Sequence, residues 1–134
     1  MKKMYILTIL LIAVIAVGFI LFAEDETTLN LKFLSSFGII TDSAPQSYEE
    51  ITIPQVFDAV YENYNLLQLE CGFDLNNHKG KTGTRYTYKM LNFPDETEVL
   101  VNVICINHKP VAGDIMSPKL NGFMLPLNYL QKIK

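Results

Sequence analysis

The chain has 134 residues, which is enough for one domain of ordinary size, and 49% of them are hydrophobic. The formal net charge is −3 at pH 7. Removing Lys2 and Lys3 from the 11 basic residues leaves 9 against 14 acidic ones, so the rest of the chain carries about −5. Nucleic-acid binding depends on a concentration of Lys and Arg, so this composition argues against nucleic acid as a partner.

Residues 4–23 form an uncharged segment, preceded by two lysines and followed by three acidic residues. An apolar helix of 20 residues spans about 30 Å, the thickness of a bilayer core, whereas the apolar part of a signal peptide has about 7 to 15 residues. We therefore expect residues 1–23 to form a membrane anchor with a cytoplasmic N-terminus, and residues 24–134 to lie outside the cytoplasm in a single-pass protein. The alternative is a secreted form, cleaved after Ala23.

Residues 24–28 are acidic and polar and are predicted to be a short tether, followed by a domain over residues 29–134. Apolar side chains at helical spacing predict a first helix over residues 29–37, which Gly38 ends. Residues 48–53 alternate in a way that is typical of an edge strand.

The longest helical pattern covers residues 54–71. Pro54 suits the first helical position, because it lacks only an N–H that would be unpaired there, and Gly72 suits the left-handed stop after the last turn. We therefore expect a helix from Pro54 to Cys71, with Gln68 on its broad apolar face and Asp58 and Glu62 opposite.

Three further strands are predicted over residues 84–91, 98–106 and 111–116, the second being the most apolar and therefore central. The tail over residues 123–130 is apolar enough to dock on the domain. The order helix, strand, helix and three strands predicts an α+β domain. After the membrane helix, it has two helices on one face of an antiparallel sheet of about four strands.

A series of short sequence words runs through the predicted outer domain: Phe33-Leu34 to Gly38, Ile53-Pro54, Val60-Tyr61 to Tyr64-Asn65, Gln68, Gly72-Phe73-Asp74-Leu75, Lys79-Gly80-Lys81, Arg85-Tyr86-Thr87-Tyr88, Asn92, Gly113-Asp114 and Gly122-Phe123-Met124. In this order they resemble domain of unknown function 4830, an uncharacterised family of clostridial-type bacteria. The family's Gly-Gly-Asp is similar to Ala112-Gly113-Asp114 here. The resemblance implies a small domain on a secretion signal or anchor, and it implies no activity.

Few residues suggest chemistry. Asp74, Arg85 and Asp114 are candidates for an ionic cluster. Two carboxylates can divide acid and base roles, but more often such residues fix loops or pair with arginine. Gln68 on an apolar helix face suggests a bond to backbone groups, with ligand contact as the alternative. The spacing of the histidines and cysteines matches no metal site, and no cofactor motif is present.

The two cysteines, Cys71 and Cys105, allow one disulfide, but both also suit an apolar core, and the sequence leaves this open. Leu66 and Leu69 fall on the polar side of the predicted long helix, so we expect either the tail or a partner to cover them.

Taken together, these sequence features favour a noncatalytic module that binds an envelope protein or a small ligand. The alternative is a cell-envelope hydrolase that uses Asp74 and Asp114.

Overall fold

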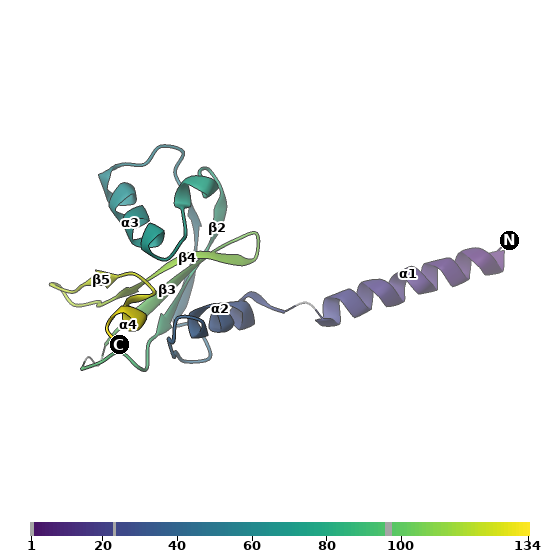
Figure 1. Cartoon of the computed structure of the whole chain (residues 1–134). Helices are drawn as coiled ribbons and strands as arrows, with labels where there is room; N and C mark the ends of the chain where they lie inside the picture. Colours follow the sequence, from purple (N-terminus) through teal and green to yellow (C-terminus); the bar gives the residue numbers. More distant parts are fainter. Residues whose placement is uncertain (1, 23, 96–97) are drawn as a thin grey trace.

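The computed structural model describes residues 2–22, 24–95 and 98–134, without the side chains of residues 16–22. Figure 1 shows a long N-terminal helix beside a domain built on a twisted sheet. The elements in chain order are α1 (Lys2–Phe22), α2 (Glu26–Ser35), β1 (Ser47–Thr52), α3 (Ala59–Glu70), the 3-10 helix η1 (Leu75–His78), β2 (Thr82–Lys89), β3 (Leu100–Ile106), β4 (Lys109–Met116), β5 (Met124–Leu125) and α4 (Tyr129–Lys132).

The sheet is antiparallel, and its order is β1-β2-β3-β4-β5. The α+β class is therefore correct, but the sheet has five strands and the prediction of about four was wrong. The fifth strand comes from the apolar tail, where Leu125 pairs with Ile115 and Met124 with Met116. The most apolar strand, β3, occupies the centre, as predicted.

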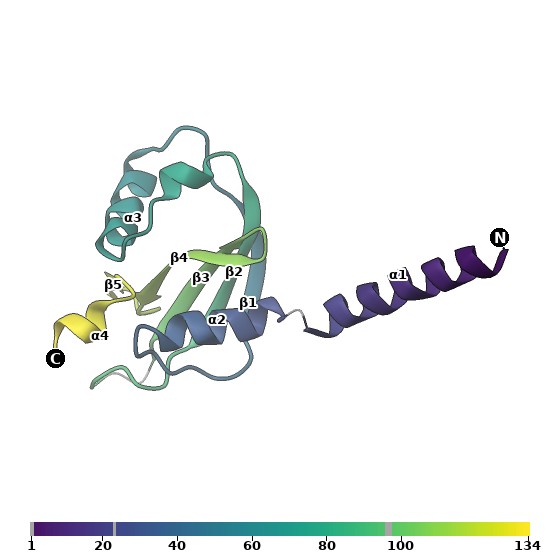
Figure 2. The same ribbon diagram turned by 45° about the vertical axis from the view of Figure 1, so that its right-hand side comes forward.

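The two longer helices of the domain cover opposite faces of the sheet, which corrects the prediction that both lie on one face (Figure 2). The reason lies in β3, whose residues 101–106 are all buried. Val103 and Cys105 belong to the core cluster that contains Leu34 of α2, whereas Ile104 belongs to the cluster on the α3 side. Successive side chains of a strand point to opposite faces, so a strand that is apolar at most positions needs cover on both.

Helix α3 begins at Ala59, five residues later than predicted. Ile53, which is completely buried, still pairs with the neighbouring chain, since its N–H donates to the Lys81 carbonyl at 2.9 Å. This pairing holds the chain extended into Pro54, and the helix starts where the Asp58 carboxylate accepts from the Tyr61 N–H at 2.9 Å. The helix ends at Glu70, one residue before the predicted Cys71, and Gly72 follows the last turn with a φ of 83°, as predicted.

Helix α2 begins at Glu26, so the predicted tether over residues 24–28 overlaps its first turn. Asp25 caps this helix by accepting from the Thr28 N–H at 2.7 Å.

The two cysteines, Cys71 and Cys105, are both free thiols. The Cys105 thiol donates to Asn30 Oδ1 at 3.0 Å, and burial raises the pKa of the thiol to about 12.

Helix α1 leads away from the sheet (Figure 1). In the part of the chain that the structure describes, no helix is both long and apolar enough to cross a membrane. The predicted membrane span covers residues 4–23. The side chains of residues 16–23 lie outside the described part of the chain.

Candidate functional site

A cleft of about 750 Å³ opens between α3 and the face of the sheet that α3 covers. Such a volume lies within the range of small-molecule sites in proteins. Its apolar walls come from β1, α3 and the last three strands: Ile51, Val60, Tyr61, Leu67, Leu100, Ile104, Met116 and Met124. Its polar lining consists of Asn63, Tyr64, Arg85, Thr87, Asn102 and Asp114.

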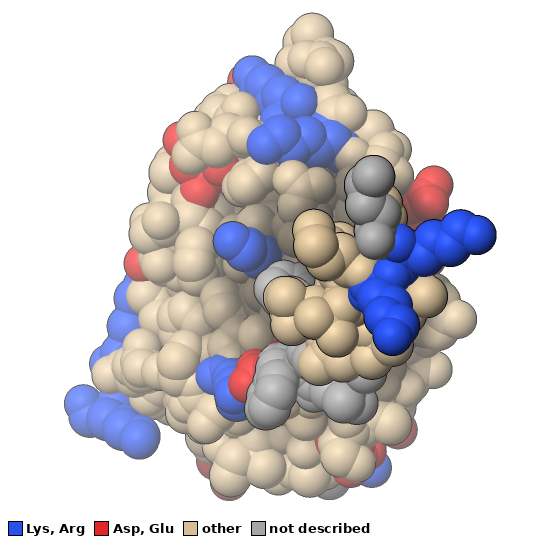
Figure 3. Space-filling model, turned by 90° about the vertical axis from the view of Figure 1, so that its right-hand side faces the viewer, with Lys and Arg blue, Asp and Glu red and all other residues tan. Residues whose placement is uncertain are grey.

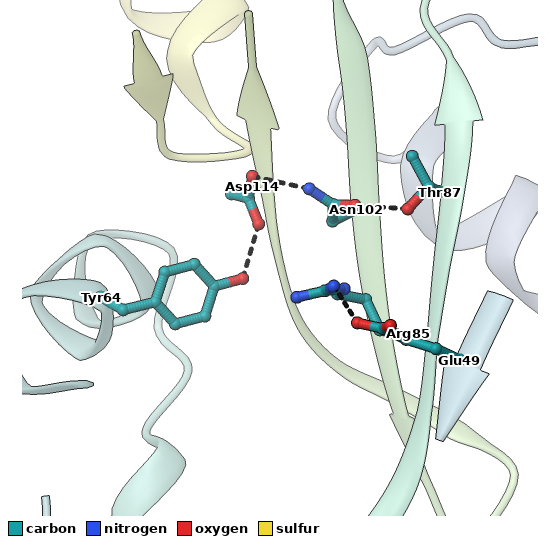
Figure 4. Close-up of polar contacts among 6 residues, drawn as sticks. All are labelled: Glu49, Tyr64, Arg85, Thr87, Asn102 and Asp114. Atoms are coloured by element: carbon teal, nitrogen blue, oxygen red, sulfur yellow. Dashed lines mark hydrogen bonds and ion pairs between the residues drawn. The ribbon is translucent and has the colours of Figure 1, made fainter. Parts of the chain in front are cut away.

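Four of these polar side chains form one hydrogen-bonded chain (Figure 4). The Tyr64 hydroxyl of α3 donates to Asp114 Oδ1 at 2.6 Å, and Asn102 Nδ2 donates to Asp114 Oδ2 at 3.1 Å. Thr87 Oγ1 donates in turn to Asn102 Oδ1 at 2.7 Å. Asn102 and Asp114 face each other directly in the β3–β4 register. The chain therefore joins three neighbouring strands to α3, with Asp114 as its final acceptor.

Burial controls the protonation of this network. It raises the pKa of Asp114, although the hydrogen bonds from Tyr64 and Asn102 and the charge of Arg85 act in the opposite direction. Burial also raises the pKa of Tyr64 well above its ordinary value, and the neighbouring Asp114 raises it further. The Tyr64 hydroxyl therefore stays protonated at physiological pH and acts as a hydrogen-bond donor to Asp114.

Arg85 reaches from β2 toward Tyr64 and Asp114, and Glu49 of β1 lies on the other side of its guanidinium (Figure 4). Arg85 Nη2 donates to Glu49 Oε1, and these residues are directly opposite in the β1–β2 register. Both side chains are partly open to solvent, with exposed fractions of 43% for Arg85 and 58% for Glu49. The arginine is therefore accessible at the side of the cleft, whereas Asp114 is only 2% exposed.

Gln68 fixes the position of α3 against the sheet. Its Nε2 donates to the Gly113 carbonyl at 2.8 Å, and its Oε1 accepts from the Gly113 N–H at 2.9 Å. The side-chain amide thus completes the edge of β4 at a point that β5 does not reach. A Cβ atom at position 113 would lie 2.4 Å from the Asn102 carbonyl oxygen, so the close approach of β4 to β3 at this point requires glycine.

The structure places the other predicted carboxylate, Asp74, in a different environment. Asp74 precedes η1, where its Oδ1 accepts from the Asn65 side chain at 3.0 Å and from the Asn76 N–H at 2.9 Å. The bond from Asn65 and those from Asn76 hold the pKa of Asp74 below its ordinary value. Among the described residues that line the cleft, Asp114 and Arg85 are present and Asp74 is not. The predicted ionic cluster is therefore divided between two places.

Leu66 and Leu69 lie on the outer side of α3, with exposed fractions of 59% and 49%. Together with Val56 and Phe57 they line a separate groove of about 510 Å³. The tail does not cover them, because its side chains Leu127 and Leu130 are buried in the core cluster on the α2 face and Met124 lines the cleft.

The sequence-based reasoning missed Tyr64, Thr87, Asn102 and Glu49 as members of the site. One signal was available: Asn102 interrupts the most apolar strand of the chain, and a buried amide requires a partner.

Figure 3 shows small separate groups of basic and acidic side chains on a mostly uncharged face. Groups of three or more potential metal ligands do not occur among the described residues.

Comparison of the chain with protein-family models, with curated proteins and with solved structures finds no match.

Proposed function

We propose that this protein is a noncatalytic binding module that holds a small ligand in the cleft between α3 and the sheet. The observation that carries the proposal is the combination of mostly apolar walls with one ordered polar network on the sheet side. Sites for small molecules have this composition: apolar contact supplies affinity, and a few fixed polar groups supply orientation.

Binding is favoured over catalysis because the polar groups of the network already satisfy one another. Asp114 accepts two hydrogen bonds in a buried position, and Asp74 has its own partners at the start of η1. A hydrolase with paired carboxylates needs both groups at one substrate bond. We therefore assign Asp114 a structural part in the cleft and Asp74 a structural part in the loop after α3.

The binding proposal can be tested with the full chain, labelled with ¹³C at the methionine methyl groups and screened by NMR against a library of small molecules. Met116 and Met124 line the cleft, whereas Met90 is buried in the core of the opposite face. A ligand of the cleft should shift the first two methyl signals and leave the third unchanged.

A blocking variant makes this screen specific. Val60 lines the cleft and is 73% exposed, so Val60→Trp should fill the opening, abolish the shifts and leave the melting temperature unchanged. The matched control is Val56→Trp, at an 83% exposed position outside the cleft lining, which should bind normally. A library without any ligand that shifts Met116 or Met124 would reject the proposed function.

We also propose that residues 4–23 anchor the module in the cytoplasmic membrane, with the N-terminus inside and the domain outside. The uncharged length of the segment and the lysines before it support this topology. External protease should digest the domain on wall-free cells, and protection would reject the topology. Release of the intact domain into the medium would instead indicate the alternative, a secreted form after signal cleavage.

Membership of domain of unknown function 4830 is a proposal that rests on the shared sequence words. An envelope protein remains the alternative partner for the module, and the groove beside Leu66 and Leu69 is the candidate interaction patch for it.

A further inference from the structure

Arg85 differs from the four residues of the hydrogen-bonded chain in being a cation with unused hydrogen-bond donors. Tyr64, Thr87 and Asn102 spend their donors on the network that ends at Asp114. A guanidinium carries five N–H donors in a planar fork, and that of Arg85 donates to Glu49. Arg85 is also the only cationic side chain among the described residues that line the cleft.

The ion pair between Arg85 and Glu49 can be broken at little cost in free energy. Both side chains are about half exposed, and an ion pair of this kind on a protein surface is weak. An anion that enters the cleft can take the place of the Glu49 carboxylate on the guanidinium, and it will gain from the apolar walls as well. Asp114 does not take up the free donors of Arg85, because its two oxygens accept from Tyr64 and Asn102.

The apolar surface beside Arg85 limits the rest of the ligand. Leu67 of α3 and Leu100 and Met116 of the sheet line the same cleft. A flat arginine fork binds a planar carboxylate through two parallel hydrogen bonds, whereas an uncharged apolar molecule would leave its donors unused.

We infer that the ligand is a small amphipathic carboxylic acid, whose carboxylate binds Arg85 in place of Glu49 and whose apolar body lies between α3 and the sheet. This inference rests on the proposed function. It adds a chemical class to the site, and it assigns Glu49 the role of an internal competitor for the arginine.

The test compares three matched probes that differ only in the head group: 4-phenylbutanoate, 4-phenylbutan-1-ol and 4-phenylbutylamine. Each is titrated into the full chain in lipid nanodiscs, with Met116 and Met124 as reporters, Met90 as the internal reference and empty nanodiscs as the partition control. The carboxylate should bind at least about tenfold more tightly than the alcohol, as expected of a charge-assisted hydrogen bond, and the amine should bind most weakly.

Three variants connect this preference to the named residues. Arg85→Gln should remove the advantage of the carboxylate over the alcohol, and Glu49→Gln should strengthen carboxylate binding because the competitor is lost. Glu50→Gln is the matched control: it removes the same charge from the next position of β1, which faces Thr84 in the register, and should change affinity little.

The inference is overturned if the alcohol or amine binds as tightly as the carboxylate, or if the carboxylate keeps its advantage in Arg85→Gln. Failure of all three probes to shift Met116 and Met124 also overturns it. In each of these cases the proposed function still stands if any other library member shifts those methyl groups and loses this effect in Val60→Trp.

Discussion

Gln68 pairs with Gly113 in the way that a neighbouring β-strand would. One side-chain amide supplies both a donor to the Gly113 carbonyl and an acceptor for the Gly113 N–H, across 45 positions of sequence. Both partners are buried, and Gln68 is 0% exposed. This contact ties the second half of α3 to the edge of β4, and it thereby sets the position of the helix that forms one wall of the cleft.

Replacing Gln68 with leucine should destabilise the domain. The side chain keeps a similar size, but the N–H and C=O of Gly113 lose their partners, at a cost of about 1 to 3 kcal/mol for each group that stays buried. Denaturant unfolding followed by circular dichroism measures the free energy of unfolding. The control is Gln46→Leu, at an exposed position before β1, which should change it by less than about 0.5 kcal/mol. Equal stability of Gln68→Leu and the wild type would show that the paired amide is dispensable.

The Asp114 carboxylate should be exchangeable with the Asn102 amide, but only as a pair. Asp114→Asn alone replaces one of the two acceptor oxygens with an NH₂ group, so the bonds from Tyr64 and Asn102 cannot both be kept, and the free energy of unfolding should fall by about 1 to 3 kcal/mol. In the double variant Asn102→Asp, Asp114→Asn, the new amide can donate to the new carboxylate, which still accepts from Thr87. The double variant should therefore recover much of the loss. Additive losses in thermal or denaturant unfolding would contradict the direct contact between these side chains.

Stability should depend on pH through Asp114. Burial raises its pKa in the folded protein, whereas an unfolded aspartate has a pKa of about 3.9. The folded state therefore binds the proton more tightly, so this group stabilises the protein most at acidic pH and loses that contribution as pH rises toward its folded pKa. The stability difference between wild type and Asp114→Asn should narrow as pH is raised from 4. A difference that widens over the same range would reverse the assigned direction of the shift.

The exposed leucines of α3 should contribute little to stability. Replacing both Leu66 and Leu69 with glutamine adds no charge beside Glu62 and Glu70 and opens no buried cavity, so the melting temperature should stay nearly unchanged. By contrast, Leu75→Ala at a completely buried position should cost about 2 to 5 kcal/mol. Unfolding of the double glutamine variant would mean that another part of the same chain covers this patch.

Several features could be predicted because they depend on neighbours in sequence. The end of α3 just before Gly72, the exposure of the edge strand β1 and the central place of β3 follow from backbone preference and from the pattern of apolar residues. The predicted start at Pro54 failed because a long-range pairing of Ile53 with Lys81 keeps the chain extended there.

The sequence by itself determined the α+β class, most of the elements and the candidate polar residues. Only the tertiary structure decided how those residues group: Asp114 meets Tyr64, which lies 50 positions away, and Arg85 meets Glu49, which lies 36 positions away, while Asp74 stays with its local loop. The physical reason is that hydrogen bonds across the sheet depend on strand register and on which face each helix covers. Both are settled when the whole core packs, because β3 must be covered on its two sides at once.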